Sequence, residues 1–388
     1  MAIYFDNAAT SYPKPSCVME AMRHYFERIG ANSGRSAHRL AHEASKLVFE
    51  ARESIAELIG AKDSSRVVFT QNATEGLNLT ILGLLNGGNQ VITTSMEHNS
   101  VMRPLRWLER TKRVKVQVVK CSPDGVLDPN DIKRKINLKT KLIIATHASN
   151  VIGTIIPIRE IGKLAKEYEI PFLVDAAQTA GCLPIDVDKD CIDLIAFSGH
   201  KELLGPQGTG CLWIREGIEP TPLKFGGTGS RSASELQPDF LPDKCESGTL
   251  NLIGIAGLGA SVKFILDKGV EVIRDAGKEL TQYLLHKLGG VDSLIIYGPK
   301  KGELQVPVVS INVVGMEPSE VGYLLDKCYD IAVRVGLHCA PRAHKTMGTF
   351  PRGTVRISLG LFNTKDEIDK LCDALAEIVK ENSNNTKF

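Results

Sequence analysis

The sequence predicts an α/β protein with a large, mostly parallel β-sheet followed by a smaller α+β region. Three observations lead to this fold class. Seven short apolar, β-rich runs occur between residues 66 and 214, helical-period segments lie between several of them, and the runs are apolar nearly throughout. Strands of that kind alternating with helices are typical of a parallel sheet that is covered on both faces.

Each apolar run is predicted as one strand, and the amphipathic segments 43–60 and 158–169 are predicted as helices between them. The region from about 20 to 255 is therefore expected to form one large α/β domain. The seven predicted strands are 66–70, 90–95, 114–120, 141–147, 170–177, 193–198 and 208–214.

After the segment 250–269 the pattern changes to fewer strands with helices between them, which predicts a smaller α+β domain. The predicted elements there are a long helical stretch through Leu288, a strand at 306–315, a helix near 317–328, a strand at 354–360 and a closing helix from Lys365 to about Asn382.

The composition excludes several classes of partner. The chain has 388 residues, with Lys plus Arg at 47 and Asp plus Glu at 45, so its charge does not favour nucleic acid or a membrane surface. Neither a signal peptide nor an uninterrupted apolar run of about 18 residues is present, and we expect a soluble, cytoplasmic protein. The nine cysteines form no CxxC pair, which favours free thiols and argues against disulfides and against a metal site.

Polar residues collect where the predicted strands end. In open parallel sheets, ligands bind outside the carboxyl ends of the strands, because strand-to-helix loops and helix N-termini converge there. Five strand ends carry such side chains, and we expect them to face one crevice. They are Asn72, Thr74 and Glu75; Glu97, His98 and Asn99; Ser149 and Asn150; Asp175 and Gln178; and Ser198, His200 and Lys201.

Each of these residues also has an ordinary structural interpretation. Thr74 is a candidate helix cap, and Asp175 a candidate loop carboxylate. His98 is a candidate surface histidine, and Asn150 is a candidate turn residue before Gly153. Their coincidence at strand ends is what favours a shared site.

Pyridoxal 5′-phosphate is a cofactor that would use all of these groups. A lysine amine forms a Schiff base with its aldehyde, a carboxylate pairs with its pyridinium nitrogen, and helix N-terminal amides with hydroxyls hold its phosphate. Lys201 and Asp175 stand at the ends of consecutive predicted strands. Lys201 is therefore the predicted Schiff-base lysine.

Nine motifs along the chain, in order and spacing, resemble the cysteine desulfurases of the class V aminotransferase group, and more closely group II, which includes selenocysteine lyases. The motifs are "YFDNAATSYPKP", "QNATEGLN", "MEHNSVMRP", "ASNVIGTI", "VDAAQTAG", "FSGHKELLGPQGTG", "ESGTLN", "RVGLHCAP" and "TVRISLGLFNT".

The resemblance implies the pyridoxal-phosphate fold type I homodimer. It implies a seven-stranded large domain at 16–255 and a small domain made of 1–15 and 256–388. It also implies the site residues: Lys201 carrying the cofactor, Asp175 on the pyridinium nitrogen, Gln178 on the phenolic oxygen, His98 stacked on the ring, Asn150 beside ring and substrate, and Thr74, Ser198 and His200 at the phosphate, with Gly248 and Thr249 added from the partner subunit. Glu75, next to Thr74, is included among the expected cofactor-binding residues.

Two further residues are expected to act on the substrate. Arg356 matches the family arginine that pairs with the substrate α-carboxylate, which suits a planar guanidinium; the alternative is a surface arginine on an edge strand. Cys339 matches the family cysteine that forms a persulfide. Positive charge nearby is expected to stabilise its thiolate, and the candidates are Arg334, His338, Arg342, His344 and Lys345.

The implied reaction converts L-cysteine to L-alanine: Lys201 shifts the α-proton, Cys339 attacks the sulfur, and a sulfur-acceptor protein then takes it from the persulfide. Three departures from the family pattern stand out. Leu337 replaces the first of two histidines usual before the cysteine, Leu250 replaces a proline, and the loop from Cys339 to Arg356 lacks the longer insertion of group I enzymes.

Three other functions remain open from the sequence. A selenocysteine lyase would act on L-selenocysteine with less need for Cys339. Another class V relative would catalyse a different β-elimination, an epimerisation or a transamination. A scaffold protein without cofactor would keep the fold only, although the joint presence of Lys201, Asp175, His98 and Arg356 argues against it.

Overall fold

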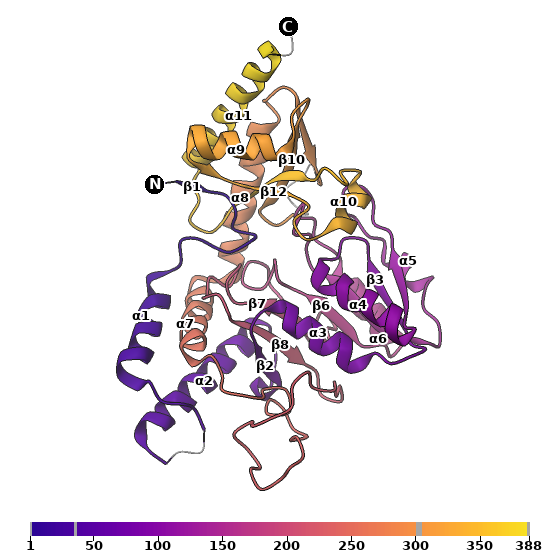
Figure 1. Ribbon diagram of the computed structural model, residues 1–388, viewed down its shortest axis with the longest axis vertical. Coiled ribbons are helices and arrows are strands. Elements are labelled where there is room, and N and C mark those ends of the chain that lie inside the picture. The colour runs from indigo at the N-terminus through magenta and orange to yellow at the C-terminus, as the bar shows by residue number, and fades with distance from the viewer. Residues whose placement is uncertain (1, 35–36, 300–304, 386–388) are drawn as a thin grey trace.

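The computed structural model describes residues 2–34, 37–299 and 305–385. A large sheet with its helices forms the lower part of the molecule in Figure 1, and a smaller sheet with its own helices forms the upper part. The N-terminus lies beside the upper part, although the chain then descends into the lower one (Figure 1). The first residues of the chain thus connect the two parts.

The large sheet has seven strands in the order β2-β8-β7-β6-β5-β3-β4. The neighbours from β7 through β6, β5 and β3 to β4 pair in parallel, and β8 runs antiparallel to both β2 and β7. All seven predicted strands are confirmed. Their bounds are β2 Val67–Thr70, β3 Gln90–Thr94, β4 Lys115–Val119, β5 Thr140–Thr146, β6 Phe172–Asp175, β7 Leu194–Ser198 and β8 Gly210–Ile214.

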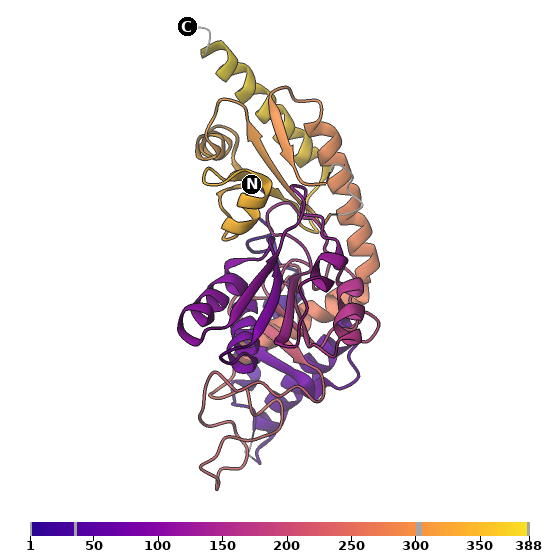
Figure 2. The same ribbon diagram turned by 90° about the vertical axis from the view of Figure 1, so that its right-hand side faces the viewer.

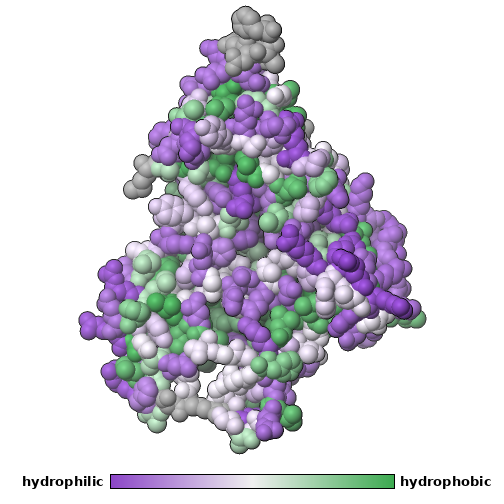
Figure 3. Space-filling view, viewed as in Figure 1, coloured by the Kyte–Doolittle hydropathy of each residue, from purple (hydrophilic) through white to green (hydrophobic). Residues whose placement is uncertain are grey.

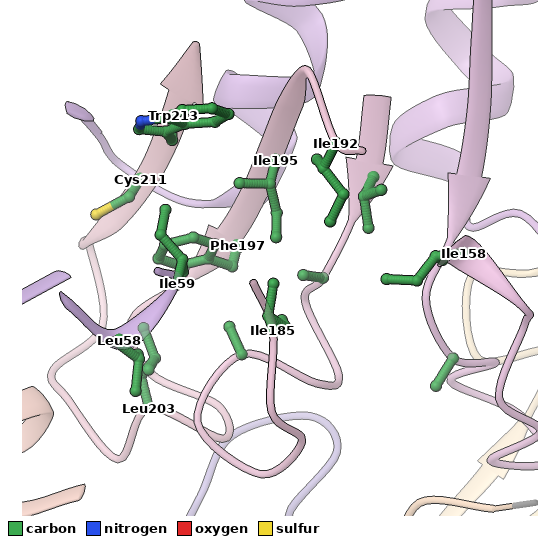
Figure 4. Packing of buried hydrophobic residues seen from close by; sticks show 14 of the residues in the cluster. Leu58, Ile59, Ile158, Ile185, Ile192, Ile195, Phe197, Leu203, Cys211 and Trp213 are labelled. Carbon is green, nitrogen blue, oxygen red and sulfur yellow. The ribbon is translucent and has the colours of Figure 1, made fainter. Parts of the chain in front are cut away.

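Both faces of this sheet are buried, as the apolar strands predict. Ile195 and Phe197 of β7 lie in one apolar cluster with Cys211 and Trp213 of β8, whereas Ala196 lies in the cluster on the opposite face. The close-up in Figure 4 shows the first four side chains on the same side of their strands. Because successive strand residues alternate between faces, the continuous apolar run supplies two cores at once.

Helices cover both faces. The cluster around Ala196 includes residues of α3 and α4, and the cluster around Phe197 includes residues of α2, α6 and α7. The helices of the lower part are α1 Ser16–His24, α2 Arg39–Leu58, α3 Ala73–Leu84, α4 Asn99–Lys112, α5 Pro129–Lys133, α6 Ile158–Glu167 and α7 Leu252–Lys268, with a π-helical turn at Tyr25–Ile29 and a 3₁₀ turn at Ser64–Arg66.

The upper part is built on a four-stranded antiparallel sheet, β12-β13-β10-β9. Its core contains Phe5 together with residues of α8, α9 and α11, and β1 pairs with β11 in parallel. Figure 2 shows α8 running along one side from the lower to the upper part. The elements are β1 Ile3–Tyr4, α8 Val270–Leu288, β9 Leu294–Tyr297, β10 Val308–Val313, α9 Pro318–Tyr329, β11 Ile331–Ala332, β12 Arg334–Gly336, α10 Pro341–Met347, β13 Thr354–Ser358 and α11 Lys365–Asn385.

The elements expected after residue 269 are present: the long helical stretch through Leu288 is α8, and α7 precedes it. The exact domain bounds stay a prediction. Within the described residues, no helix combines the length and the apolarity needed to cross a membrane. Hydrophilic residues are spread over both parts of the face seen in Figure 3.

Candidate active site

Asp175 and Lys201 lie at the ends of neighbouring strands. Asp175 is the last residue of β6, and β6 pairs in parallel with β7, which ends at Ser198 just before Lys201. The Asp175 side chain is buried, and its Oδ1 accepts a hydrogen bond from the Ala177 amide at 3.0 Å. The sheet topology therefore brings both residues to one edge, as the sequence predicts.

Each of these two groups affects the ionisation of the other. Burial lowers the pKa of Lys201, and the Asp175 carboxylate opposes that shift. Burial raises the pKa of Asp175, while the Ala177 amide and the Lys201 ammonium oppose it. A lysine with a lowered pKa loses its proton more readily, and only the neutral amine is a nucleophile or a base.

His98 is held neutral at the start of α4. It is the N-cap residue, and its Nδ1 accepts a hydrogen bond from the Ser100 amide at 3.1 Å. Burial lowers the pKa of His98 to about 4, with further lowering from Lys201, Arg103 and Arg356. Since Nδ1 is an acceptor, the neutral ring carries its proton on Nε2.

Hydroxyl groups gather at the N-terminus of α3. The Ser100 Oγ lies 2.7 Å from the Thr74 Oγ1 and 2.8 Å from the His98 Nδ1, and the Ala73 amide donates to the Ser198 Oγ at 3.0 Å. Ser100 was not predicted from the sequence, although its position two residues after His98 was the available signal. A helix N-terminus surrounded by hydroxyls suits a phosphate.

The interpretation of Thr74 as a helix cap is wrong. Asn72 caps α3, because its Oδ1 accepts the Glu75 amide at 3.0 Å. The Glu75 carboxylate itself accepts the Gln71 amide and forms an ion pair with Lys224, both at 2.6 Å. The hydroxyl of Thr74 is therefore left to the site, while the carboxylate of Glu75 is engaged elsewhere.

Gly248 and Thr249 are not among the residues that line the Cys339 pocket. Both are exposed in the segment that precedes α7, and the Gly248 amide donates to the Gly227 carbonyl at 2.8 Å. Thr249 and Glu75 line the same small cavity of about 140 Å³. A contribution of these two residues from a partner subunit stays a prediction.

Arg356 is buried in the middle of its sheet. Strand β13 lies between β12 and β10, and the residue is 2% exposed, so the interpretation as a surface arginine on an edge strand is wrong. Its Nη1 donates to the Asn150 carbonyl at 3.0 Å, and its Nη2 donates to the Asp6 Oδ1 at 2.7 Å. The Asn150 side chain donates to the His338 carbonyl at 2.7 Å.

The N-terminal segment was missed as part of the site. Besides the contact of Asp6 with Arg356, hydrogen bonds from Thr10, Ser11 and Lys14 converge on the carbonyl of His200, directly before Lys201. The Lys14 Nζ lies 2.9 Å from that oxygen. The segment therefore links the predicted substrate arginine to the predicted cofactor lysine.

Cys339 is exposed in a turn between β12 and α10, whereas its neighbours His338 and Ala340 are buried. His338 and Cys339 both have positive φ, 46° and 56°, and the Cys339 carbonyl accepts the Asn99 amide at 2.8 Å, which ties the turn to α4. The residue lines an open pocket of about 510 Å³ together with Thr74 and His98. All nine cysteines are free thiols, of which Cys328 and Cys339 are exposed.

The two histidines beside Cys339 do not supply the expected positive charge. Burial lowers the pKa of His338 to about 2 and that of His344 to about 4, so both rings are neutral near pH 7. Their ring nitrogens lie 3.0 Å from the Thr354 Oγ1 and 2.7 Å from the Thr349 Oγ1, respectively. This part of the prediction is wrong: the basic side chain that lines the Cys339 pocket is Arg103, whereas Arg342 and Lys345 line the neighbouring cavity.

The residues present fit pyridoxal phosphate. Within the described residues, Gln178 Oε1, His200 Nδ1 and Arg356 Nε are buried without a hydrogen-bond partner, and such atoms are costly unless a ligand pairs with them. The Gln178 Nε2 donates one hydrogen to the Ala8 carbonyl at 3.0 Å, and its second hydrogen remains for a further acceptor. With the Asp175 and Lys201 pair, the set of groups matches the aldehyde, ring nitrogen and phosphate of this cofactor.

The seven-stranded sheet and the Asp175 and Lys201 pair at its edge define a pyridoxal-phosphate enzyme of fold type I. The family model described as Aminotransferase class-V matches residues 3–371. The chain therefore belongs to the class-V aminotransferase family, among its cysteine desulfurases. Enzymes of this family depend on pyridoxal phosphate.

Three similar proteins are described as cysteine desulfurases or probable cysteine desulfurases. A probable cysteine desulfurase of Methanothermobacter thermautotrophicus is 38% identical over 97% of this chain and 94% of its own length. The apo structure of the cysteine desulfurase from Thermococcus onnurineus NA1 matches with a TM-score of 0.93 at 36% identity, covering 98% of this chain and 95% of that one. The cysteine desulfurase CsdA of Escherichia coli, in an S-sulfonic acid form, matches with a TM-score of 0.88 at 26% identity over the same shares.

Proposed function

We propose that this chain is an L-cysteine desulfurase, which converts L-cysteine to L-alanine and takes up the sulfur as a persulfide on Cys339. The observation that carries the proposal is the position of Cys339, an exposed thiol that lines the same pocket as His98 and Thr74. The charge of Cys339 also acts on the pKa of Lys201, so the thiol and the amine belong to one site.

The proposed cofactor residues surround the strand ends. Lys201 would hold the aldehyde carbon, Asp175 the ring nitrogen and the hydroxyls of Thr74 and Ser198 the phosphate, while His98 would lie against the ring. When bound, pyridoxal phosphate withdraws electrons from the substrate and thereby weakens the bond between its β-carbon and sulfur.

Arg356 and Asn150 are proposed to bind the substrate carboxylate. The guanidinium is buried and held on two sides, by the Asn150 carbonyl and the Asp6 carboxylate. Such support fixes the plane of the guanidinium, and a planar fork in a fixed orientation favours a carboxylate over other groups. Asp6 is thus proposed to position Arg356 for the substrate.

The reaction is balanced without any external oxidant or reductant. Lys201, with its lowered pKa, accepts the α-proton of the substrate and returns a proton. The Cys339 sulfur forms a bond to the substrate sulfur as the carbon–sulfur bond breaks. The substrate thiol and the Cys339 thiol each bring one hydrogen. One of these two hydrogens ends on the methyl group of alanine, and the other ends on the persulfide.

Three finer statements belong to the proposal. The persulfide of Cys339 passes its outer sulfur to a thiol of an acceptor protein, the enzyme is a homodimer in which Gly248 and Thr249 reach the partner's cofactor, and it works in the cytoplasm. They rest on the resemblance of the chain to the cysteine desulfurases.

The test compares alanine release from L-cysteine and from L-selenocysteine, with dithiothreitol as reductant, by wild type and by Cys339→Ala. We expect wild type to turn over L-cysteine and the variant to lose that activity. Cys328→Ala is the matched control, because it removes the other exposed thiol.

Two results would contradict the proposal. Selenocysteine turnover that is equal in wild type and Cys339→Ala, with little cysteine turnover in either, would identify a selenocysteine lyase. Formation of a keto acid without alanine would identify another class V reaction.

A further inference from the structure

A basic groove lies between α4 and α10, beside the Cys339 pocket. It has a volume of about 700 Å³, and Trp107, which is 51% exposed, lies on its wall with Met102 and Pro341. Strongly hydrophilic side chains lie next to apolar ones over α4 on the face seen in Figure 3. We call this feature the α4–α10 groove; its basic residues are Arg103, Arg106, Arg110, Arg342 and Lys345.

The regular spacing of α4 and α10 places these charges on exposed helix faces. Arg103, Arg106 and Arg110 follow at intervals of three and four residues and therefore share one face of α4, whereas Leu105 and Leu108 of the same helix are buried. Similarly, Arg342 and Lys345 are three residues apart on α10.

The positive charge of the groove is poorly neutralised. Within the described part of the chain, none of its lining residues is acidic. Glu109, on the same helix as Arg106, forms an ion pair with it. Burial and the like charge of Arg106 lower the pKa of Arg342, so the cations of the groove repel one another. Opposite charges brought by a partner would relieve this repulsion.

The α4–α10 groove is continuous with the Cys339 pocket. The two cavities share Asn99, Arg103 and Trp107 as lining residues, and the Asn99 amide holds the Cys339 carbonyl. When a segment of a partner protein binds in the groove, the residues next to that segment in the partner's sequence therefore lie at the Cys339 thiol.

We propose that the α4–α10 groove docks an acidic segment of the sulfur-acceptor protein, so that a cysteine of that segment meets the persulfide of Cys339. The outer sulfur passes to the acceptor thiol, which becomes the persulfide, and Cys339 regains a thiol with the acceptor's proton. This inference rests on the proposed desulfurase function and adds the kind of partner.

An acidic protein fits the groove better than a nucleic acid does. The whole chain carries a net charge of only +2, so the basic charge is local, without the extended excess typical of nucleic-acid-binding proteins. The apolar wall of Trp107, Met102 and Pro341 is suited to side chains of a folded partner. Exposed aromatic and arginine side chains together are also frequent at the centre of protein interfaces.

The test uses two synthetic peptides with a central cysteine, one rich in Asp and Glu and the other with Lys at those positions. Radiolabelled sulfur from L-cysteine is followed from the enzyme to each peptide. The variant is R110E/K345E, and the control is K370E/K380E, which makes the same change of charge on the exposed face of α11. Alanine release with dithiothreitol is measured in parallel.

We expect the acidic peptide to be preferred by wild type, and its apparent KM to rise about 10-fold or more in R110E/K345E at low salt. The control should behave as wild type, and alanine release with dithiothreitol should be unchanged in both. Equal use of the acidic and basic peptides, or equal behaviour of R110E/K345E and the control, would overturn the proposal.

Two further measurements separate the remaining outcomes. A fluorescently labelled acidic peptide without cysteine reports docking by anisotropy, so the groove is tested even if wild type releases no alanine and the proposed function fails. A single-stranded homopolymer RNA is the other probe. Tighter binding of that RNA than of the acidic peptide, lost in R110E/K345E, would make the groove a nucleic-acid site and overturn the proposal.

Discussion

The edge of the large sheet and the Cys339 turn serve the same pocket but are held in different ways. Asp175 and Lys201 follow paired strands whose residues are buried, so their positions depend on the core of the protein. Cys339 is exposed and is held by a short turn through its carbonyl bond to Asn99. The first region is suited to fixing a cofactor, and the second to moving a thiol between a substrate and a partner.

The largest effect is expected from Lys201→Ala, which removes the reactive group of the sheet edge. Proton transfer at the substrate α-carbon should be lost, which lowers the rate of alanine formation by about 10²- to 10⁴-fold or more. The visible absorbance of the lysine-bound cofactor should disappear as well. Lys370→Ala is the control, because Lys370 is exposed on α11, outside the site; loss of the absorbance in both variants would contradict the assignment.

Cys339→Ala should abolish sulfur transfer at the turn while cofactor binding at the strand ends is kept. Because Asp175 and Lys201 are held by the strands of the sheet, we expect the variant to bind pyridoxal phosphate as wild type does, with an unchanged absorbance spectrum, while sulfur transfer from L-cysteine is lost. A variant that loses the cofactor would show that the turn also supports the sheet edge. Cys328→Ala should keep both properties.

Arg356→Lys is expected to weaken substrate binding by an intermediate amount. A lysine cannot replace the planar fork, so KM for L-cysteine should rise about 10-fold, with a smaller change in kcat. Asp6→Asn keeps the shape but removes the charge that faces Arg356, and the rise in KM should be smaller. An effect of Asp6→Asn on cofactor absorbance alone would contradict its role in positioning Arg356.

The smallest effect on activity is expected from Glu97→Gln. This substitution should instead change how the stability of the folded state depends on pH. Burial raises the pKa of Glu97 to about 8 from 4.5, so between these values the folded state keeps a proton that the unfolded state releases. The contribution of Glu97 to stability therefore falls as pH rises through this window, by up to about 1.4 kcal/mol per pH unit. Glu97→Gln should flatten the pH profile of urea unfolding there, and an unchanged profile would contradict a protonated Glu97.

The buried histidines act in the opposite direction. Burial lowers the pKa of His98, His147 and His200 to about 4 from 6.5, so the unfolded state binds more protons between these values. Stability should fall as pH drops from about 6.5 to 4. Urea unfolding over this range checks the sign, and rising stability would contradict it.

The same comparison explains what the sequence could predict. Strand ends are readable from apolar runs, so the neighbourhood of Asp175 and Lys201 followed from the pattern of a parallel sheet. The partner of Arg356 could not be read in this way, because Asp6 reaches it through tertiary packing across almost the whole chain. Neutral His338 and His344 were missed since their ionisation depends on burial, which local sequence does not reveal.

One measurement tests the central claim most directly. Wild-type enzyme is incubated with L-cysteine without reductant, and its proteolytic peptides are analysed by mass spectrometry. We expect the peptide that contains Cys339 to gain the mass of one sulfur atom, in an amount that matches the alanine released, while the peptide with Cys328 is unchanged. Alanine release without added sulfur on Cys339 would contradict the proposed function.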